Sequence, residues 1–287
     1  MSDLLLVIVF GIMQGSIYAA VALGLVLVFG VTDIVNFAHS ELVTFGAFGI
    51  ILLTPLLGFP PALAITLAGV GIVAFLLYHL GFKFTIGNHL QALVFSLGLV
   101  LIIQSFMVRQ YSTNPRSGPE LEGVLNIPGV GPLSWTRVVV LVALLLLVVA
   151  FTIVLRSSWV GLALRATGDD QAAAQTLGMS PRKVGMYAFT VSGVLAASAG
   201  VAIAALYPVT PLTGTQFLMK GFVVVVIGGL GSASGALVAS LAFGVLESLG
   251  ATYIDPSLTN VYAFALMIVV LLLAPQGLFN RKVGRAG

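Results

Sequence analysis

Long apolar runs separated by short polar stretches make up most of this chain. About 20 mainly apolar residues are enough for a helix to cross a bilayer, and nine runs approach or reach that length. The pattern predicts an all-α polytopic membrane protein with about 8–10 transmembrane or re-entrant helices, nine being the best value. The nine expected segments are 4–29, 41–57, 60–78, 91–108, 137–155, 185–207, 216–229, 234–250 and 258–274.

Composition points to the same class. The 287 residues are 59% hydrophobic and 7% charged, whereas a soluble domain carries about 25% charged residues. We therefore expect a single transmembrane domain over 1–287, with no soluble catalytic domain. The first segment has no basic stretch before it, so it is expected to be a retained span and not a cleaved signal peptide. The absence of cysteine excludes disulfides and thiolate metal sites.

Some apolar segments are short or interrupted by glycine, notably 41–57, 216–229 and 234–250. Such segments are typical of broken or re-entrant helices that line a cavity. Ordinary spans packed through small residues are the alternative. The segments 30–49 and 228–244 also resemble each other weakly, which leaves an internal repeat possible.

Basic residues indicate an orientation. If the polar stretch 156–184 is cytoplasmic, eight of the 12 basic residues fall inside and four outside or near the outer face. The positive-inside rule then places the N-terminus outside and the C-terminus in the cytoplasm. The four are Arg109, Arg116, Arg137 and Lys220, the last within a span. The proline-rich outer loop 109–136 is expected to be an ordered but irregular cap.

Polar residues cluster where the second segment begins. Asp33, Asn36, His39 and Glu41 are expected at a cytoplasmic turn and the start of a span. Ionisable groups within a membrane are functional by default, which favours a role in a substrate path. Alternatively, Asp33 or Asn36 caps the following helix and Glu41 complements its dipole. His39 and Glu41 are two residues apart, so they face different sides of a helix and predict no metal site.

The remaining candidate chemistry is sparse. Gly228, Gly229, Gly231 and Gly235 follow an apolar run without a phosphate-binding lysine, which indicates close helix packing or a helix break. Lys220 and Glu247 are each expected to reach a nearby interface. Neither predicts a proton relay, so the energy for any transport is expected from another subunit.

The stretch 156–184 is the longest polar interruption on the basic-rich side. Asp169 and Asp170 precede an alanine run, Gly178 ends it, and Pro181 blocks its extension. This pattern predicts a short helix from Asp169 to Gly178 outside the bilayer, exposing small side chains. Such a helix can transmit force from a soluble partner; a solvated loop helix is the alternative.

Three motifs resemble the branched-chain amino-acid permease family of ABC importers, specifically the shorter of its two membrane subunits. They are FGVTDIVNFAHSELVTFGAF (29–48), GLALRATGDDQAAAQTLGMSPRKV (161–184) and KGFVVVVIGGLGSASGALVASLAFGVLES (220–248), the last followed by PQGLF (275–279). The resemblance extends over essentially the whole chain. It implies a multi-pass permease of the bacterial inner membrane with no enzymatic activity of its own.

The resemblance also implies partners and sites. A second homologous permease, two cytoplasmic ATP-binding subunits holding ATP and Mg, and an extracytoplasmic solute-binding protein would complete the complex; this chain would bind lipid, but no cofactor or nucleic acid. The implied coupling-helix residues are Arg165, Asp169, Asp170, Ala172, Ala173, Ala174 and Gly178. The candidate residues for a substrate path or gate are Asn36, His39, Glu41, Gly46, Gly228 and Gly229.

Two departures from the family pattern stand out. A Glu-Ala-Ala pattern of the family is here Ala172-Ala173-Ala174, which leaves any acidic docking contact to Asp169 or Asp170. Ser40 replaces the glycine of an Ala-His-Gly-Glu run. The expected cargo is a branched-chain or related small amino acid; urea or a short amide carried by the same machinery is one alternative, and an autonomous channel or ion-coupled carrier is the other.

Overall fold

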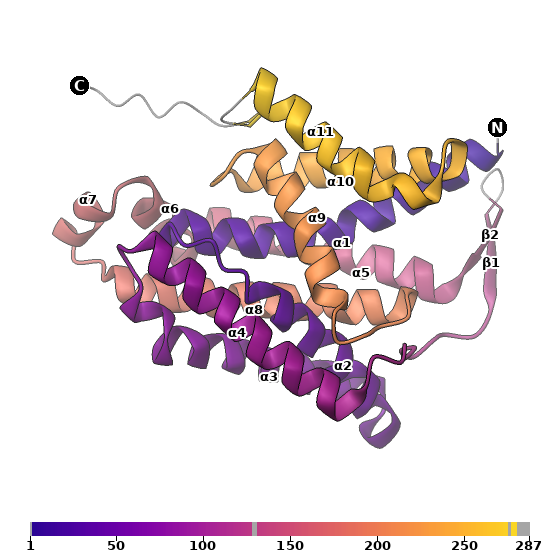
Figure 1. Ribbon diagram of the computed structural model, residues 1–287, viewed down its shortest axis with the longest axis horizontal. Helices are drawn as coiled ribbons and strands as arrows, with labels where there is room; N and C mark the ends of the chain where they lie inside the picture. The colour runs from indigo at the N-terminus through magenta and orange to yellow at the C-terminus, as the bar shows by residue number, and fades with distance from the viewer. Residues whose placement is uncertain (1, 128–130, 275–276, 280–287) are drawn as a thin grey trace.

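The computed structural model describes residues 2–127, 131–274 and 277–279, and most of them are helical (Figure 1). The nine predicted apolar segments all form helices, which confirms the all-α polytopic membrane fold. The helices that correspond to the predicted segments are α1 (Ser2–Thr32), α2 (His39–Leu57), α3 (Phe59–Leu80), α4 (His89–Tyr111), α5 (Trp135–Ser157), α8 (Pro181–Leu206), α9 (Thr213–Gly228), α10 (Ala233–Tyr253) and α11 (Thr259–Leu273). The shorter elements are η1 (Phe82–Phe84), β1 (Val124–Ile127), β2 (Gly131–Ser134), α6 (Trp159–Asp169), α7 (Gln171–Thr176) and η2 (Pro256–Leu258).

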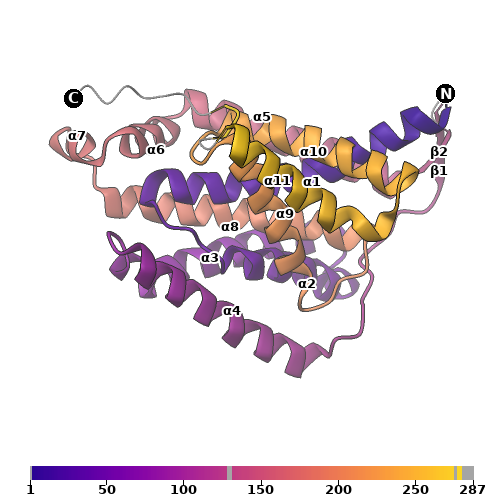
Figure 2. The same cartoon turned by 45° about the horizontal axis from the view of Figure 1, so that its top comes forward.

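The helices differ in length. Among the described residues, eight helices are long and apolar enough to cross a membrane. The ninth, α9, has 16 residues and runs obliquely to its neighbours (Figure 1). Helix α1 begins, and α11 ends, at opposite ends of the bundle (Figures 1 and 2). The expected orientation likewise places these two helix ends on opposite sides of the membrane.

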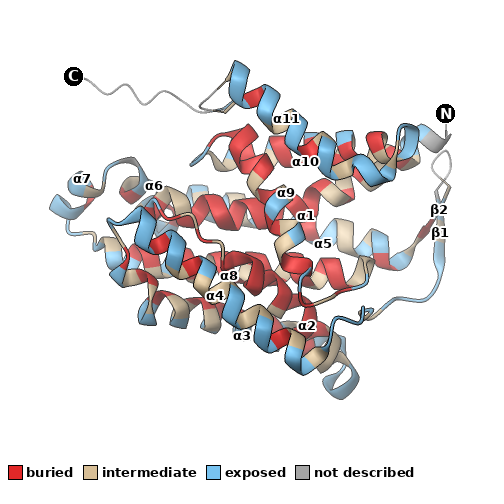
Figure 3. Ribbon diagram, viewed as in Figure 1, coloured by how far each residue is buried: buried red, intermediate tan, exposed pale blue. Residues whose placement is uncertain are grey.

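Helices α1 and α8 form the centre of the bundle. Ile17, Tyr18 and the alanines that follow them are fully buried, and Figure 3 shows buried positions concentrated in α1, α2 and α8. Small residues bring the backbones together: a Cβ added to Gly15 would lie 2.7 Å from the carbonyl oxygen of Ser240. Helix packing within a membrane relies on such close approach. By contrast, α4 and α11 expose apolar side chains such as Leu101 and Leu272, which suits contact with lipid or another apolar surface.

The packing contains an inverted repeat. In this repeat α1 corresponds to α8, α2 to α9 and α3 to α10. Helix α1 packs on α10, and correspondingly α8 packs on α3. Helix α2 packs on α8, and correspondingly α9 packs on α1. The pairs α2–α3 and α9–α10 also correspond. Because α1 and α8 start at opposite ends of the bundle, the units α1–α3 and α8–α10 are oppositely oriented (Figure 1). The internal repeat suggested by the weak resemblance of 30–49 to 228–244 is therefore wrong in its pairing. The first segment lies mainly in α2 and the second mainly in α10, and these helices do not correspond.

The two ends of the bundle carry different structures. At one end, β1 pairs antiparallel with β2, with Val124 opposite Ser134. Arg116 is held to the residues before α9 by backbone hydrogen bonds with Val209, 2.9 and 2.8 Å long. The expectation of an ordered but irregular cap over 109–136 is therefore wrong only in its irregularity, where β1 pairs with β2. Helices α6 and α7 project at the other end (Figure 2).

Candidate functional site

The polar stretch 156–184 contains two helices where one was predicted. Ser158 caps α6 by accepting a 3.0 Å hydrogen bond from the Gly161 amide. Asp170 caps α7 by accepting hydrogen bonds from the amides of Ala172 and Ala173, at 2.8 and 2.9 Å. Asp169 is the last residue of α6. The short helix predicted between Asp169 and Gly178 is present as α7, with Asp170 as its N-cap, but Asp169 belongs to the separate helix α6, which was not predicted.

The predicted stop at Gly178 is confirmed. Gly178 has φ +82°, a conformation that glycine adopts without the strain of a Cβ atom. Its amide donates to the Gln175 carbonyl at 2.9 Å, and the Met179 amide donates to the Ala174 carbonyl at 3.0 Å. This pair of bonds is a Schellman motif, which satisfies carbonyls left free at the end of α7. Pro181 then occupies the first turn of α8.

The predicted exposure of small side chains on α7 is confirmed at every named position except one alanine. Ala172 and Ala173 are exposed, whereas Ala174 is buried. Leu177, at the end of the helix, is 76% exposed. Leu177 was not among the residues predicted from the sequence, although an isolated apolar residue in a polar stretch is a visible signal. An exposed leucine at the end of a short helix is suited to enter an apolar groove of a partner protein.

Arg165 has a structural role in this arrangement. Its guanidinium donates to the carbonyl oxygens of Leu155 and Arg156, at the C-terminal end of α5. Those carbonyls lack partners within the helix, and a cation there also complements the helix dipole. Arg165 therefore fastens α6 to α5.

The α6–α7 segment is also attached to the end of α1. A Cβ added to Gly168 would lie 2.5 Å from the carbonyl oxygen of Gly30, so the two backbones touch. The Gln171 side-chain amide donates to the Val31 carbonyl at 2.9 Å. Leu164 is buried in a cluster that includes Val31. A displacement of α6 and α7 would therefore move the last turn of α1.

The chain that leaves α1 turns back into the bundle. Asp33 has φ +54°, and its carbonyl oxygen lies 2.9 Å from His89 Nδ1. A Cβ on Gly24 would lie 2.6 Å from His39 Cε1. Gly24 precedes the end of α1 by eight residues, or about 12 Å at 1.5 Å per residue. Helix α2 therefore starts well inside the bundle, and the expectation that His39 and Glu41 lie at a surface turn is wrong.

Neither predicted side-chain cap of α2 is present. The N-cap residue is Ala38, and no side chain caps the helix. Instead, the amides of His39, Ser40 and Glu41 donate to the backbone carbonyls three residues earlier, at 3.1–3.3 Å. This tight turn satisfies the amides without a side chain. The capping interpretation of Asp33 and Asn36 is therefore wrong.

Glu41 lies where the starts of α2 and α9 meet. The carboxylate accepts hydrogen bonds at Oε1 from Ser40 (3.0 Å) and from the Gln104 amide (3.1 Å). The same amide nitrogen donates to the Thr215 hydroxyl at 2.7 Å. Gly214 is pressed against Ser40, since its added Cβ would lie 2.0 Å from the Ser40 carbonyl oxygen. Sequence analysis missed Gln104 and Thr215; polar residues inside apolar segments were the available signal.

Several polar atoms around this junction have no partner within the described chain. Glu41 is fully buried, and its Oε2 makes no hydrogen bond. His39 faces the other side of α2, as predicted: its Nδ1 lies 3.2 Å from the Ser192 hydroxyl, and Nε2 is unpaired. Asn36 is also buried with Oδ1 unpaired. Buried polar atoms without partners are costly, so their concentration here marks a candidate site.

The glycines predicted for a path or gate lie elsewhere. Gly46 touches α8, since an added Cβ would lie 2.5 Å from the Ala197 Cα. Gly228 similarly contacts the backbone of Ala236. Gly229 ends α9 with φ +101°. Gly228 is thus a site of close packing and Gly229 a helix break, as the glycine pattern indicated. Neither these two glycines nor Gly46 contacts Glu41.

Lys220 and Glu247 form an ion pair inside the bundle. Their side chains are 19% and 9% exposed, respectively. The expectation that each reaches an interface separately is wrong, because α9 and α10 pack together and bring the two charges into contact. Among the described residues, no group of three potential metal-ligating side chains is present.

The chain resembles known membrane transport proteins in sequence. Residues 7–271 match the family described as "Branched-chain amino acid transport system / permease component". The chain is 29% identical to the high-affinity branched-chain amino acid transport system permease protein LivH of Salmonella typhimurium, with 94% of each chain covered. BraD of Pseudomonas aeruginosa, of the same description, is also 29% identical, again over 94% of both chains.

A second kind of relative and a solved structure were also found. LivM of Escherichia coli, another permease protein of such a system, is 32% identical over 48% of this chain and 33% of its own length. The solved structure of PsaBC from Streptococcus pneumoniae in complex with Fab has 18% identity and a TM-score of 0.45, covering 96% of this chain and 91% of the other.

Proposed function

Because this chain belongs to the family of permease components of branched-chain amino acid transport systems, we propose that it is the transmembrane subunit of an ABC importer. Its cargo would be branched-chain or related small amino acids, moved across the bacterial inner membrane by ATP-driven alternating access. A second, homologous permease would complete the membrane part. Two cytoplasmic ATP-binding subunits, which hold ATP and Mg, and an extracytoplasmic solute-binding protein would complete the transporter.

The α6–α7 segment would be the joint with an ATP-binding subunit. Leu177 and the exposed face at Ala172 and Ala173 would contact the partner. The Asp170 carboxylate already accepts two hydrogen bonds as the cap of α7. Its role would therefore be to stabilise the helix, with contact to the partner only at the periphery of the interface. Arg165, which holds α5, would keep the segment at a fixed position relative to the membrane.

The observation that carries this proposal is the attachment of α6–α7 to α1 through Gly168 and Gln171. The end of α1 leads within seven residues to His39, where α2 begins. A push on α6–α7 would thus reach the junction of α2 and α9 through a short, continuous piece of backbone. ATP binding in the partner would then shift the population between outward-open and inward-open arrangements.

The junction of α2 and α9 would form part of the substrate path. Two helices that start inside the bundle, α2 and the 16-residue α9, meet there in corresponding positions of an inverted repeat, and transporter sites are commonly built at repeat interfaces. Opening the junction would expose the unpaired oxygen of Glu41 and the unpaired atoms of Asn36 and His39 to cargo or water. Polar groups at this depth would then be solvated during transport and not permanently buried.

The joint can be tested by purifying the chain from its native membrane in a gentle detergent and identifying the proteins that accompany it. We expect a second permease and ATP-binding subunits. Leu177→Ser should lose the ATP-binding subunits while retaining the second permease, because it removes the exposed apolar contact. Leu177→Met is the matched control and should retain both. A chain that purifies alone and still transports would overturn the proposed function.

A further inference from the structure

Lys220 and Glu247 form the one salt bridge among the described residues, and it lies between two membrane helices. A charged side chain within a membrane helix is costly to insert, and such residues are rare unless they have a function. Two apolar side chains of similar volume would hold α9 against α10 as well or better. An ion pair at this position therefore calls for a functional explanation.

Hydrogen bonds fix the carboxylate from the opposite side. The Tyr18 hydroxyl donates to Glu247 Oε2 at 2.7 Å, and the Gln14 amide donates to the Tyr18 hydroxyl at 2.7 Å. The Tyr207 hydroxyl in turn donates to Gln14 Oε1. These hydrogen bonds would keep the Glu247 carboxylate bound to the Tyr18 hydroxyl even if Lys220 donated to another acceptor.

Lys220 keeps donor capacity beyond the salt bridge. An ammonium has three N–H groups, and among the described residues its hydrogen-bond acceptor is Glu247 Oε1. The Tyr18 ring centroid lies 5.8 Å from Nζ and adds a weaker attraction. A second carboxylate can therefore bind Lys220 without displacing any other described contact.

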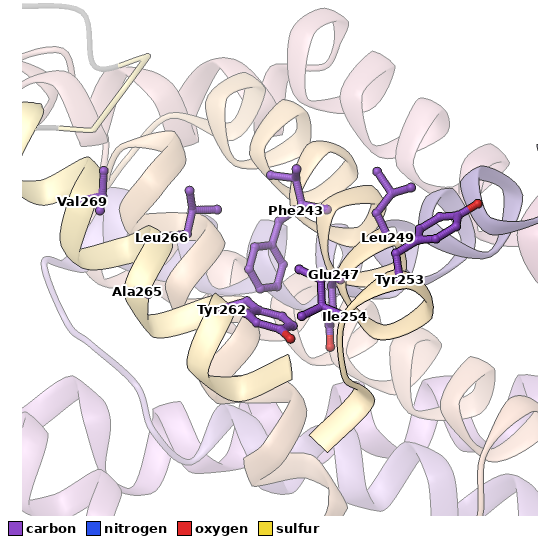
Figure 4. A pocket seen from close by; sticks show the side chains of 11 residues that line it. Phe243, Glu247, Leu249, Tyr253, Ile254, Tyr262, Ala265, Leu266 and Val269 are labelled. Carbon is purple, nitrogen blue, oxygen red and sulfur yellow. The ribbon is translucent and has the colours of Figure 1, made fainter. Parts of the chain in front are cut away.

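An apolar groove adjoins the carboxylate of the ion pair, and Lys220, which does not line the groove, is reached through Glu247. It has a volume of about 500 Å³ and lies between α10 and α11, with Glu247 in its wall (Figure 4). Phe243 and Tyr262 lie near the carboxylate, and Leu246, Leu266 and Val269 supply aliphatic surface. Pockets for small molecules typically measure about 300–1,000 Å³ and combine apolar walls with a few polar groups. The groove has these properties.

We propose that Lys220 and Glu247 are the recognition site for the zwitterionic head of an amino acid, with its branched aliphatic side chain in the groove. The cargo ammonium would bind Glu247, and its carboxylate would bind Lys220. The resting ion pair is then exchanged for two ligand ion pairs, so no buried charge is left unpaired at any stage. This inference rests on the proposed function, which supplies the class of cargo.

Photo-crosslinking of the complete transporter in nanodiscs tests the site directly. The probe is a leucine analogue with a diazirine in its side chain, and adducts are mapped by mass spectrometry. We expect adducts on Phe243, Leu246 or Leu266, suppressed by excess leucine but not by leucinamide, which lacks the carboxylate. Adducts confined to other parts of the chain, in a complex that transports leucine, would overturn the inference.

Groove variants provide a second measurement. Leu246→Trp fills the groove and should raise KM for leucine at least about tenfold, equivalent to about 1.4 kcal/mol of binding. Val238→Trp is the matched control, because Val238 is 49% exposed on the same helix but does not line the groove. It should leave KM unchanged. Both variants should co-purify with the second permease; an equal KM in the two would contradict a ligand site.

The double variant Lys220→Glu with Glu247→Lys separates recognition from a structural role. It restores an ion pair, so a purely structural role predicts restored transport with normal KM. Recognition predicts an assembled complex whose KM remains at least about tenfold raised, since each ligand charge then meets a group of its own sign. If the wild-type complex moves no branched-chain amino acid, the proposed function fails, and this inference fails with it. If transport is intact and KM is normal in these variants, this inference alone fails.

Discussion

The contact between Gly168 and Gly30 gives the sharpest prediction for coupling. In Gly168→Ala, the new Cβ would lie 2.5 Å from the Gly30 carbonyl oxygen, and ordinary contact begins near 3.4 Å. The obstacle is backbone, so α6 must move away from α1 by about 0.9 Å. Overpacking of this kind typically costs about 1–3 kcal/mol, offset by about 1 kcal/mol of improved helix propensity. The fold should therefore survive with a loosened joint.

We expect leucine uptake by the reconstituted Gly168→Ala transporter to fall about fivefold, which corresponds to about 1 kcal/mol, the middle of the net penalty of about 0–2 kcal/mol on the coupled state. ATP hydrolysis and subunit composition should change by less than twofold. Gly69→Ala is the matched control: Gly69 also lies in a helix, but no atom is within 4 Å of its added Cβ. Uptake should be normal in that variant. Normal uptake by Gly168→Ala as well would refute transmission through this contact.

Three further predictions concern other parts of the molecule. Gly178→Val places a branched side chain at φ +82°, a left-handed conformation that costs about 1–2 kcal/mol. Membrane insertion, checked by immunoblot, should be intact while leucine uptake is lost. Normal uptake would show that Gly178 is not needed for coupling. Gln104→Leu should lower stability by about 1–3 kcal/mol, because the buried Glu41 carboxylate loses a donor; an unchanged Tm in nanodiscs would contradict the hydrogen bond. Because the chain has no cysteine, Thr113→Cys and Ser157→Cys can report orientation, and a membrane-impermeant maleimide added to intact cells should label only the first.

The periodicity and composition of the chain were enough to predict the nine membrane helices and their class. Each helix satisfies its own backbone hydrogen bonds, so a run of apolar residues specifies it without reference to neighbours. The stop of α7 at Gly178 is equally local, since it depends on one residue that tolerates a positive φ. The break at Asp170 was not predicted, because an aspartate suits the start of a new helix and the first turn of a continuous one equally well.

The sequence by itself therefore determined the membrane class, the helical segments and the polar stretch that connects α5 to α8. Only the tertiary structure decided which polar residues meet. Lys220 and Glu247 are 27 residues apart in sequence, and Glu41 and Gln104 are 63 apart; neither separation has a helical period that could indicate contact. The return of residues 33–38 into the bundle was likewise undetectable, because it depends on the space that Gly24 leaves for His39. Such long-range contacts depend on how separate helices pack, a property that no short segment carries.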